Sequence, residues 1–313
     1  MQQTTCDISV VIPLYNKASD IYLTLTSVLV QSLRPREVIV VDDGSTDGSA
    51  EIVEQMIANE PHVKLVRQAN AGVSVARNRA IEMAQGEWVA LLDGDDLWSP
   101  DYLKAVQMMI ERWPECGAIG TGFFVEDRFR RIVGSTPEKT GKVDFFEESM
   151  RRYVLIPSAT TLRRDLVLRL GGFPEGMRIG EDQWVWIRLM QLGERFCFSP
   201  MPLVRYSRTA SNRSAAIYRS EACSHTIAEL YDAAQDATLN EYVARVGLGK
   251  AITQSVRGGT DDARRAILDF AYTTHSRRQL RRLRLLNALP CALRPMFDAV
   301  YCALAWIIKR RGA

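Results

Sequence analysis

The sequence predicts an α/β protein with a mostly parallel central sheet, helices on both faces of that sheet, and a helical C-terminal region. Three observations carry this prediction. Short runs rich in apolar residues occur four times within the first 96 residues. Segments with apolar residues at helical spacing separate these runs. Polar and acidic residues follow the runs, and the carboxyl ends of parallel strands are where such sheets bind ligands.

Each expected element rests on its own pattern. The run "ISVVIP" is apolar without alternation, which is typical of a strand buried on both faces. The next segment places Ile21, Leu25 and Val28 on one side of a helix. Gly44 and the Ser, Thr and Asp residues after it suit the start of a second helix. By the same reasoning, strands are expected at 7–13, 37–41, 63–68 and 87–93, and helices within 21–32, near 48–59 and within 71–86.

The pattern changes twice further along the chain. Residues 115–215 are more irregular, but they include the helical stretch "EDQWVWIRLMQL", which opens with Glu181 and Asp182. After about residue 215 the chain is helical in pattern and rich in Ala and Arg. We therefore expect a first domain with two halves and a second, helical domain. The expected bounds are 1–96 and 97–215 for the halves, and 216–313 for the helical region.

Composition narrows the class of protein. Hydrophobic residues make up 47% of the chain and charged residues 25%, values that are ordinary for a soluble globular protein. The six cysteines form no CxxC pair and have no metal-type spacing to the three histidines, which predicts reduced thiols and no zinc site. Because there is no signal-peptide pattern and no run of about eighteen apolar residues, a cytoplasmic location is expected.

The stretch "EWVALLDGDDLWSP" joins an apolar run to three carboxylates, Asp93, Asp95 and Asp96. Carboxylates this close repel one another unless a cation lies among them. Oxygen ligands without a nearby His or Cys favour Mg²⁺ or Mn²⁺, whose coordination is completed by water and substrate phosphates. The alternative is a solvated acidic turn that caps the following helix.

Two further strand ends carry polar residues. Pro13, Tyr15 and Asn16 end the first strand, and "DDGSTD" ends the second. Each stretch alone is also explained as a strand exit, a turn or a helix cap. The first strand is not followed by GxGxxG, and GxxxxGK[ST] is absent, which argues against a dehydrogenase or a P-loop NTPase. Without a glycine cradle, bound phosphates would be neutralised chiefly by a metal.

Taken together, these motifs resemble the family-2 glycosyltransferases of the GT-A fold. Five stretches occur in the order and spacing of that family: "VVIPLYNK", "VIVVDDGSTDGS", "NAGVSVARNRAI", "WVALLDGDDLW" and "GGFPEGMRIGEDQWVWIRL". The resemblance spans residues 7–215. It implies a metal-dependent, inverting hexosyltransferase that moves a sugar from a nucleotide diphosphate sugar to an acceptor hydroxyl. It also makes 1–96 the nucleotide-sugar half and 97–215 the acceptor half.

The resemblance assigns five residues to the nucleotide. Pro13, Tyr15 and Asn16 would form the wall of the base and ribose pocket, with Tyr15 against the ring. Asp43 would accept hydrogen bonds from the base, and Arg77 would lie beside the same nucleotide. Asp43 and Tyr15 suit uracil well, so a UDP-sugar is favoured, with thymine and guanine nucleotides as alternatives.

The resemblance also assigns roles in donor binding, metal binding and catalysis to four acids. Asp93 would lie near the ribose, and Asp95 would bind Mn²⁺ or Mg²⁺ at the diphosphate. Asp182 would be the general base that takes the acceptor proton, with Glu181 beside it. Both acids of this pair also suit a helix N-terminus, so an acidic cap without a catalytic role is the alternative.

Two positions depart from the family pattern. Many members carry a His where this chain has Thr209, and Arg208 or Arg205 is a candidate to contact the diphosphate instead. Many members also have an Asp where this chain has Trp184. Trp184 would form an apolar or sugar-stacking wall in the acceptor site, although packing in the core is the favoured interpretation.

The C-terminal region is basic. From residue 241 onward there are fourteen Lys and Arg residues and five Asp and Glu residues. Five arginines follow one another at helical spacing, and an apolar stretch comes next, a combination that suits an anionic membrane. The five are Arg277, Arg278, Arg281, Arg282 and Arg284. We expect peripheral contact with the inner face of the cytoplasmic membrane and a glycan or lipid-linked acceptor, as in bacterial surface polysaccharide assembly. No nucleic-acid-binding motif accompanies the arginines. A solvated face or a protein contact is the alternative.

Two other functions are compatible with the same motifs. A sugar nucleotidyltransferase would make the nucleotide sugar rather than use it, but "PLYNKASD" lacks the Gly-rich basic loop typical of that class. A nucleotide-sugar-binding protein without activity is the second alternative. Asp95 and Asp182 argue against it, because a binding protein needs no general base.

Overall fold

The computed structural model describes residues 5–126, 131–134, 136–151, 154–177, 179–207, 223–235 and 237–311, with side chains described up to residue 302. The chain divides into two compact units. The first comprises residues 1–176 and 181–213, and the second comprises residues 177–180 and 214–313.

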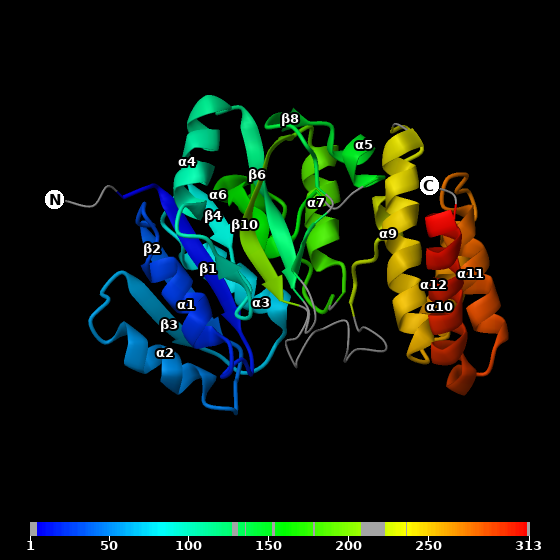
Figure 1. The fold of residues 1–313 in the computed structure, drawn as a ribbon, viewed down its shortest axis with the longest axis horizontal. Helices are drawn as coiled ribbons and strands as arrows, with labels where there is room; N and C mark the ends of the chain where they lie inside the picture. The colour runs from blue at the N-terminus through cyan, green and yellow to red at the C-terminus, as the bar shows by residue number, and fades with distance from the viewer. Residues whose placement is uncertain are drawn as a thin grey trace. The chain divides into compact units, whose positions relative to one another are not determined.

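The first unit is built on one sheet with the strand order β3-β2-β1-β4-β9-β6-β10-β5 (Figure 1). The edge strands β7 and β8 pair with β6 and β10. The strands are β1 (Ile8–Leu14), β2 (Glu37–Asp42), β3 (Val63–Arg67), β4 (Trp88–Leu91), β5 (Leu97–Trp98), β6 (Cys116–Glu126), β7 (Arg131–Val133), β8 (Gly141–Val143), β9 (Thr160–Arg163) and β10 (Arg195–Ser207).

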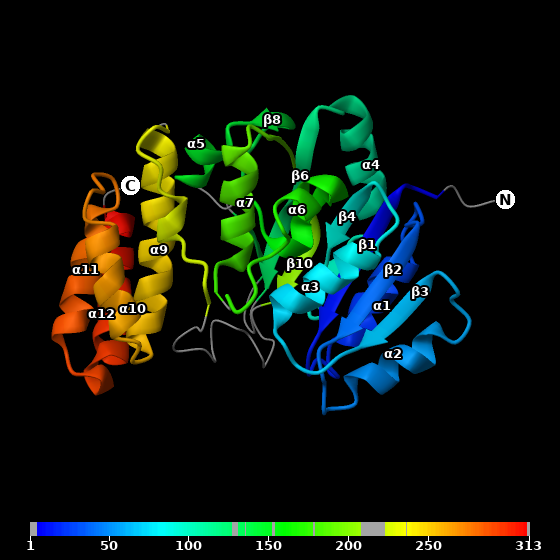
Figure 2. The same ribbon diagram turned by 180° about the vertical axis from the view of Figure 1, so that it is seen from behind.

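Helices cover both faces of this sheet (Figures 1 and 2). Apolar residues of α1, α2 and α4 share one continuous core with β1 and β2, whereas α3 and α6 pack on the opposite face. The helices of this unit are α1 (Ile21–Leu29), α2 (Ser49–Ile57), α3 (Val73–Met83), α4 (Tyr102–Arg112), α5 (Phe145–Ser149), the short 3₁₀ helix η1 (Pro157–Ala159), α6 (Arg164–Arg169) and α7 (Glu181–Gln191).

The predicted fold class is confirmed. Strands β3, β2, β1 and β4 are mutually parallel, as the largely apolar sequences of β1, β2 and β4 predict. β9 joins antiparallel to β4 and to β6, so the second half of the sheet is mixed rather than parallel. Every residue of β2 and β4 is buried, and it is this burial from both faces that removes the polar alternation from their sequences.

The expectation of reduced thiols is wrong at one pair of cysteines. Cys116 in β6 and Cys197 in β10 form a disulfide although they lie 81 positions apart in the sequence. Both residues are buried on neighbouring parallel strands, with their Cα atoms 6.1 Å apart. The cysteine spacing gave no sign of this pair, because the pairing of β6 with β10 is a long-range property of the sheet.

The second unit is helical. Its elements are η2 (Ala228–Leu230), α9 (Ala237–Val256), α10 (Asp261–Asp269), α11 (Arg277–Ala288), η3 (Cys291–Leu293) and α12 (Arg294–Arg311). Glu241 of α9 accepts hydrogen bonds from the backbone N–H groups of Thr274 and His275 and from the Thr273 hydroxyl, just before α11. Burial disfavours the charge of Glu241, but these hydrogen bonds lower its pKa to about 2. The carboxylate therefore fixes α11 to α9.

In the part of the chain that the structure describes, no helix combines the length and the apolar character that crossing a membrane requires.

Candidate active site

Three strand ends meet at one edge of the sheet in the first unit. In the parallel register Leu14 pairs with Asp42, and Val11 pairs with Leu91, so the segments that follow β1, β2 and β4 leave the sheet side by side. These segments contain the polar residues that the sequence analysis selected. The carboxyl edge of β1, β2 and β4 is therefore the candidate active site.

The segment after β1 is held against the segment after β2. Asn16 has a φ of 50°, a left-handed conformation that is uncommon for a residue other than glycine. Its backbone N–H donates to the Ser45 hydroxyl at 2.9 Å, and its side-chain oxygen accepts from the Thr46 N–H at 2.8 Å. Pro13 lies in β1, and the adjacent Tyr15 is 39% exposed. An aromatic ring is thus left on the surface beside a fixed turn.

Asp43 is buried and organises the segment after β3. One of its oxygens accepts from the Gln68 side chain and from the Ala71 N–H, both at 2.8 Å. The other oxygen accepts from the Gly72 N–H at 2.7 Å. The next residue, Gly44, has a φ of 75°, and an added Cβ would lie 3.0 Å from a backbone nitrogen of this segment. The carboxylate of Asp43 thus fixes the segment that leads into α3.

Arg77 of α3 connects two acids that lie far apart in the sequence. It is 2% exposed, and its terminal nitrogens donate to Asp93 at 2.7 Å and to Glu181 at 2.9 Å. The guanidinium also lies over the ring of Phe173, 5.2 Å from its centroid. Burial works against the charge of Arg77, but Asp93 and Glu181 raise its pKa above the usual value. Arg77 therefore joins the acids after β4 to the acids that begin α7.

The three aspartates after β4 have different surroundings. Asp96 is buried, and its carboxylate accepts from the Ser158 hydroxyl at 2.5 Å and from the Ser207 N–H at 2.8 Å. Burial, together with the charges of its aspartate neighbours, raises the pKa of Asp96 well above its usual value. Asp95 forms a 2.7 Å ion pair with Lys17. Asp96 thus anchors the turn, whereas Asp93 and Asp95 face cationic groups.

Lys17 is the residue of this site that the sequence analysis did not select. Its signal was present in "PLYNK", where a basic residue follows the polar end of the first strand. A lysine in such a loop reads as an ordinary surface residue, however, because the sequence does not reveal that Asp95 lies 78 positions away in the chain but next to it in space.

Asp182 lies in the first turn of α7, directly after Glu181. Burial and the adjacent charge of Glu181 raise the pKa of Asp182 to about 7, although Arg77 acts in the opposite direction. One oxygen of Asp182 accepts from the backbone N–H of Gln183 at 2.8 Å. A carboxyl group with a pKa near neutrality is suited to accept and release a proton at physiological pH.

The remaining candidates are placed as follows. Trp184 and its neighbour Trp186 are buried in the core of the first unit. Arg205 forms an ion pair with Glu126. Arg208, the candidate for a diphosphate contact, and Thr209 both lie outside the described residues.

A metal would find only part of its coordination here. Among the described residues, no three His, Cys, Asp or Glu side chains converge on one point. Asp95 and Asp93 are nevertheless hard oxygen ligands, and Mg²⁺ and Mn²⁺ are commonly held by one or two carboxylates, substrate phosphates and water. The residues present therefore fit a cation that arrives together with a phosphate-bearing ligand.

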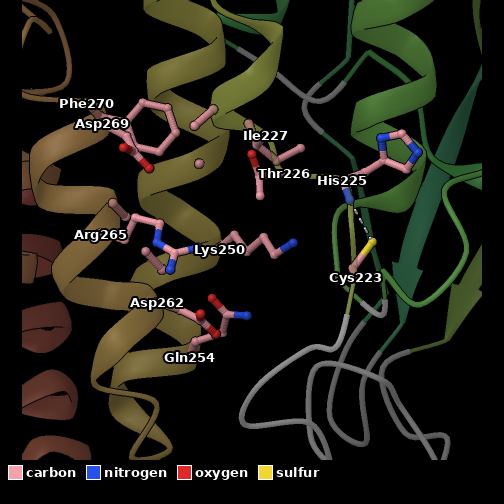
Figure 3. Close-up of a pocket in the computed structure, with 14 residues that line it drawn as sticks. Cys223, His225, Thr226, Ile227, Lys250, Gln254, Asp262, Arg265, Asp269 and Phe270 are labelled. Carbon is pink, nitrogen blue, oxygen red and sulfur yellow. Dashed lines mark hydrogen bonds between the residues drawn. The ribbon is translucent and has the colours of Figure 1, made fainter.

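A separate pocket lies within the helical unit (Figure 3). Its cavity volume is about 130 Å³, and it is partly open to solvent. Lys250 of α9 and Arg265 of α10 line it together with His225, Asp262 and Asp269, so its wall carries both basic and acidic side chains. This mixture selects neither an anionic nor a cationic ligand.

Comparison with known proteins agrees with these observations. The model of the family described as "Glycosyl transferase family 2" matches residues 9–171, just over half of the chain. The chain is 45% identical to the uncharacterized glycosyltransferase YibD of Escherichia coli over 109 residues, which cover 35% of this chain and 32% of YibD. It is 43% identical to TuaG of Bacillus subtilis, named as a putative teichuronic acid biosynthesis glycosyltransferase, over 37% of this chain and 46% of TuaG. The matches thus span less than half of either relative.

Solved structures share the fold over most of the chain. Residues 1–349 of S. aureus TarS in complex with UDP-GlcNAc align with a TM-score of 0.66 and 20% identity, over 90% of this chain and 88% of that one. A mannosyltransferase from Pyrobaculum calidifontis in complex with GDP-Man and Mn²⁺ aligns with a TM-score of 0.53 and 21% identity, over 96% and 80%. At these identities the likeness establishes the fold alone. The GT-A fold and the acids at the strand ends agree with the family match. This chain therefore belongs to glycosyl transferase family 2.

Proposed function

We propose that the protein transfers a sugar from a nucleotide diphosphate sugar to an acceptor hydroxyl, with inversion at the anomeric carbon and with a divalent cation at Asp95. The observation that carries this proposal is the network in which the buried Arg77 joins Asp93 to Glu181. It fixes the acids after β4 relative to the N-terminus of α7, where Asp182 has a pKa of about 7. A single displacement requires a cation at the leaving diphosphate and a carboxylate that removes the acceptor proton. The network would hold the two groups in fixed positions.

In this proposal residues 1–96 hold the donor and residues 97–215 hold the acceptor. Tyr15 would lie against the base, since its ring is exposed beside the fixed turn at Asn16. Pro13 would add to the wall of this pocket. Asp43 would contribute a contact to the base and would also keep the segment after β3 in place, because three donors of that segment already bind its oxygens.

Asp95 would hold Mn²⁺ or Mg²⁺, and Asp93 would lie near the ribose. The cation would supply positive charge that stabilises the negative charge on the departing diphosphate. The fit of the site supports this role, because the hard carboxylate oxygens of these two residues suit such ions. Arg77 would maintain the position of Asp93 through their 2.7 Å hydrogen bond.

Asp182 would remove the proton from the acceptor hydroxyl. Its position in the first turn of α7, beside Glu181, keeps two acids at a helix N-terminus, where the helix dipole favours negative charge. Glu181 would act through its charge and through Arg77. Direct attack by the activated hydroxyl forms no covalent enzyme intermediate, and it therefore inverts the anomeric centre.

A UDP-sugar is the proposed donor, and a surface polysaccharide or lipid-linked glycan is the proposed acceptor. The complex of TarS with UDP-GlcNAc and the description of TuaG support these choices. Because the mannosyltransferase was solved in complex with GDP-Man, a GDP-sugar is the alternative donor.

Calorimetric titration with UDP, dTDP and GDP, each with and without Mn²⁺, tests the donor class and the cation together. We expect UDP to bind most tightly, and at least about tenfold more tightly when Mn²⁺ is present, because the cation offsets the repulsion between Asp95 and the phosphates. Replacing Asp95 by Asn should remove this enhancement. Equal binding of UDP with and without Mn²⁺ would contradict the proposed cation site.

The helical unit is proposed to contact an anionic membrane. Four arginines on α11 are exposed, whereas Arg282 pairs with Asp298 of α12 at 2.5 Å. Exposed apolar side chains lie on the same two helices, including Leu285 at 52% and Met296 at 65% exposure. Basic and apolar groups exposed together suit an interface with anionic lipid. The four exposed arginines are Arg277, Arg278, Arg281 and Arg284.

Sedimentation with vesicles tests this contact. The protein should pellet with vesicles that contain anionic lipid and stay in the supernatant with purely phosphatidylcholine vesicles. Changing the four exposed arginines of α11 to Glu should abolish pelleting, since each basic residue near the surface contributes about 1 kcal/mol. Unchanged pelleting of this variant would show that the arginines of α11 do not make the contact.

A further inference from the structure

The backbone of Lys17 is held in place, and its side chain is directed at Asp95. Its side chain is 12% exposed, and its ammonium lies 2.7 Å from an oxygen of Asp95, whose side chain is 14% exposed. Its backbone N–H donates to the Ser49 hydroxyl at 2.8 Å. Its carbonyl accepts from the N–H groups of Asp20 and Ile21 where α1 begins. The backbone of Lys17 is thus fixed from both sides, and its ammonium is directed at Asp95.

Lys17 does not neutralise all the carboxylates of the candidate active site. Asp93, Asp95 and Asp96 lie within four consecutive positions, and Lys17 pairs with one of these carboxylates at 2.7 Å. Arg77 carries one positive charge and pairs with two carboxylates, those of Asp93 and Glu181. The region therefore holds more carboxylates than cations among the described residues, and a further positive charge is favourable there.

The ammonium of Lys17 nevertheless occupies an oxygen that a metal at Asp95 would use. An ammonium and a divalent ion repel each other at this separation, and both take a carboxylate oxygen as their partner. Lysine has a flexible four-carbon stem, so its ammonium can move to another anion nearby without a change in the backbone. The diphosphate of a donor would offer such an anion.

We infer that Lys17 blocks Asp95 to divalent cations until a diphosphate is bound, so that the metal enters only together with the donor. This inference rests on the proposed function. In the absence of donor, Lys17 neutralises Asp95 in place of the metal. When the donor binds, its phosphates attract the ammonium of Lys17, and an oxygen of Asp95 becomes available.

The test measures Mn²⁺ binding without any nucleotide, by the electron paramagnetic resonance signal of free Mn²⁺. Lys17→Met removes the ammonium and keeps the length of the side chain, so it should bind Mn²⁺ at least about tenfold more tightly than the unmodified protein. Lys17→Arg keeps a positive charge and should bind as weakly as the unmodified protein. Lys104→Met removes an exposed lysine of α4 and controls for net charge.

A second series adds saturating UDP. Here the Mn²⁺ affinities of the unmodified protein and of Lys17→Met should agree within about threefold, because the ammonium of Lys17 would then pair with the phosphates and no longer with Asp95. The double variant with Lys17→Met and Asp95→Asn should lose the gain seen without nucleotide. If circular dichroism shows that Lys17→Met is unfolded, Lys17→Gln, which keeps a hydrogen-bond donor for Asp95, decides instead.

The possible results separate the inference from the proposed function. Mn²⁺ binding by Lys17→Met that is no tighter than that of the unmodified protein or of Lys104→Met, while UDP still promotes Mn²⁺ binding, would overturn the inference alone. Absence of Mn²⁺ binding in all variants, with and without UDP, would overturn the proposed cation site as well.

Discussion

Replacing Asp182 by Asn is expected to lower the rate of sugar transfer by about 10²–10⁴-fold, because the general base is lost. The amide is nearly the same size and still accepts the hydrogen bond from the Gln183 N–H. Nucleotide affinity should therefore stay nearly unchanged. Release of UDP from a UDP-sugar measures the rate, and titration calorimetry measures the affinity. Asp165→Asn, which changes an exposed acid of α6, is the matched control and should have little effect.

The pH dependence of the same reaction follows from the raised pKa of Asp182. Burial and the charge of Glu181 raise this pKa to about 7. The base acts in its deprotonated form, so the rate should increase with pH up to about 7 and level off above it. Asp182→Asn should lose this dependence together with most of the rate. Full activity in Asp182→Asn would mean that another group removes the proton.

Replacing Arg77 by Met should have the largest effect on stability. It removes the guanidinium but leaves Asp93 and Glu181 facing a buried apolar side chain. Breaking a buried ion pair by removing one partner costs about 3–5 kcal/mol in the free energy of unfolding. Urea denaturation followed by tryptophan fluorescence measures this loss. Five of the six tryptophans, Trp88, Trp184 and Trp186 among them, belong to the first unit, so the signal reports mainly on the unit that contains Arg77.

Two controls show whether the loss arises from the shared ion pair. Arg77→Lys keeps the charge, but a single ammonium lacks the fork that reaches both acids, so most of the loss should remain. Arg79→Met removes a neighbouring arginine of α3 that makes two hydrogen bonds of 3.3 Å among the described residues, and it should cost about 1 kcal/mol or less. An unfolding free energy for Arg77→Met equal to that of Arg79→Met would contradict the bridging role.

The first half of the sheet was predictable because its signals are local. A strand covered on both faces has no polar alternation, and the sequences of β1, β2 and β4 record this directly. Amphipathic spacing located α1, α2 and α3 in the same way. Since parallel strands place their carboxyl ends at one edge, the polar residues after β1, β2 and β4 could be assigned to one site before the structure was known.

The connections within the site were not predictable, because they depend on contacts between distant segments. Arg77 and Glu181 are 104 positions apart, and nothing near either residue indicates the other. The pairing of Lys17 with Asp95 and the disulfide between Cys116 and Cys197 also join residues that are far apart in the sequence. Local patterns identify which residues are polar at a strand end. They do not specify which partner each charge finds.

The central claim is that Asp182 activates a nucleophile for one direct displacement. The anomeric configuration of the first product tests it most directly. The protein is incubated with Mn²⁺ and an α-linked UDP-sugar, either UDP-glucose or UDP-N-acetylglucosamine, with water as the acceptor. Proton nuclear magnetic resonance then records the released sugar before its anomers equilibrate. The account predicts that the β-anomer appears first, and that Asp182→Asn releases almost none. First appearance of the α-anomer would contradict a single displacement and the role proposed for Asp182.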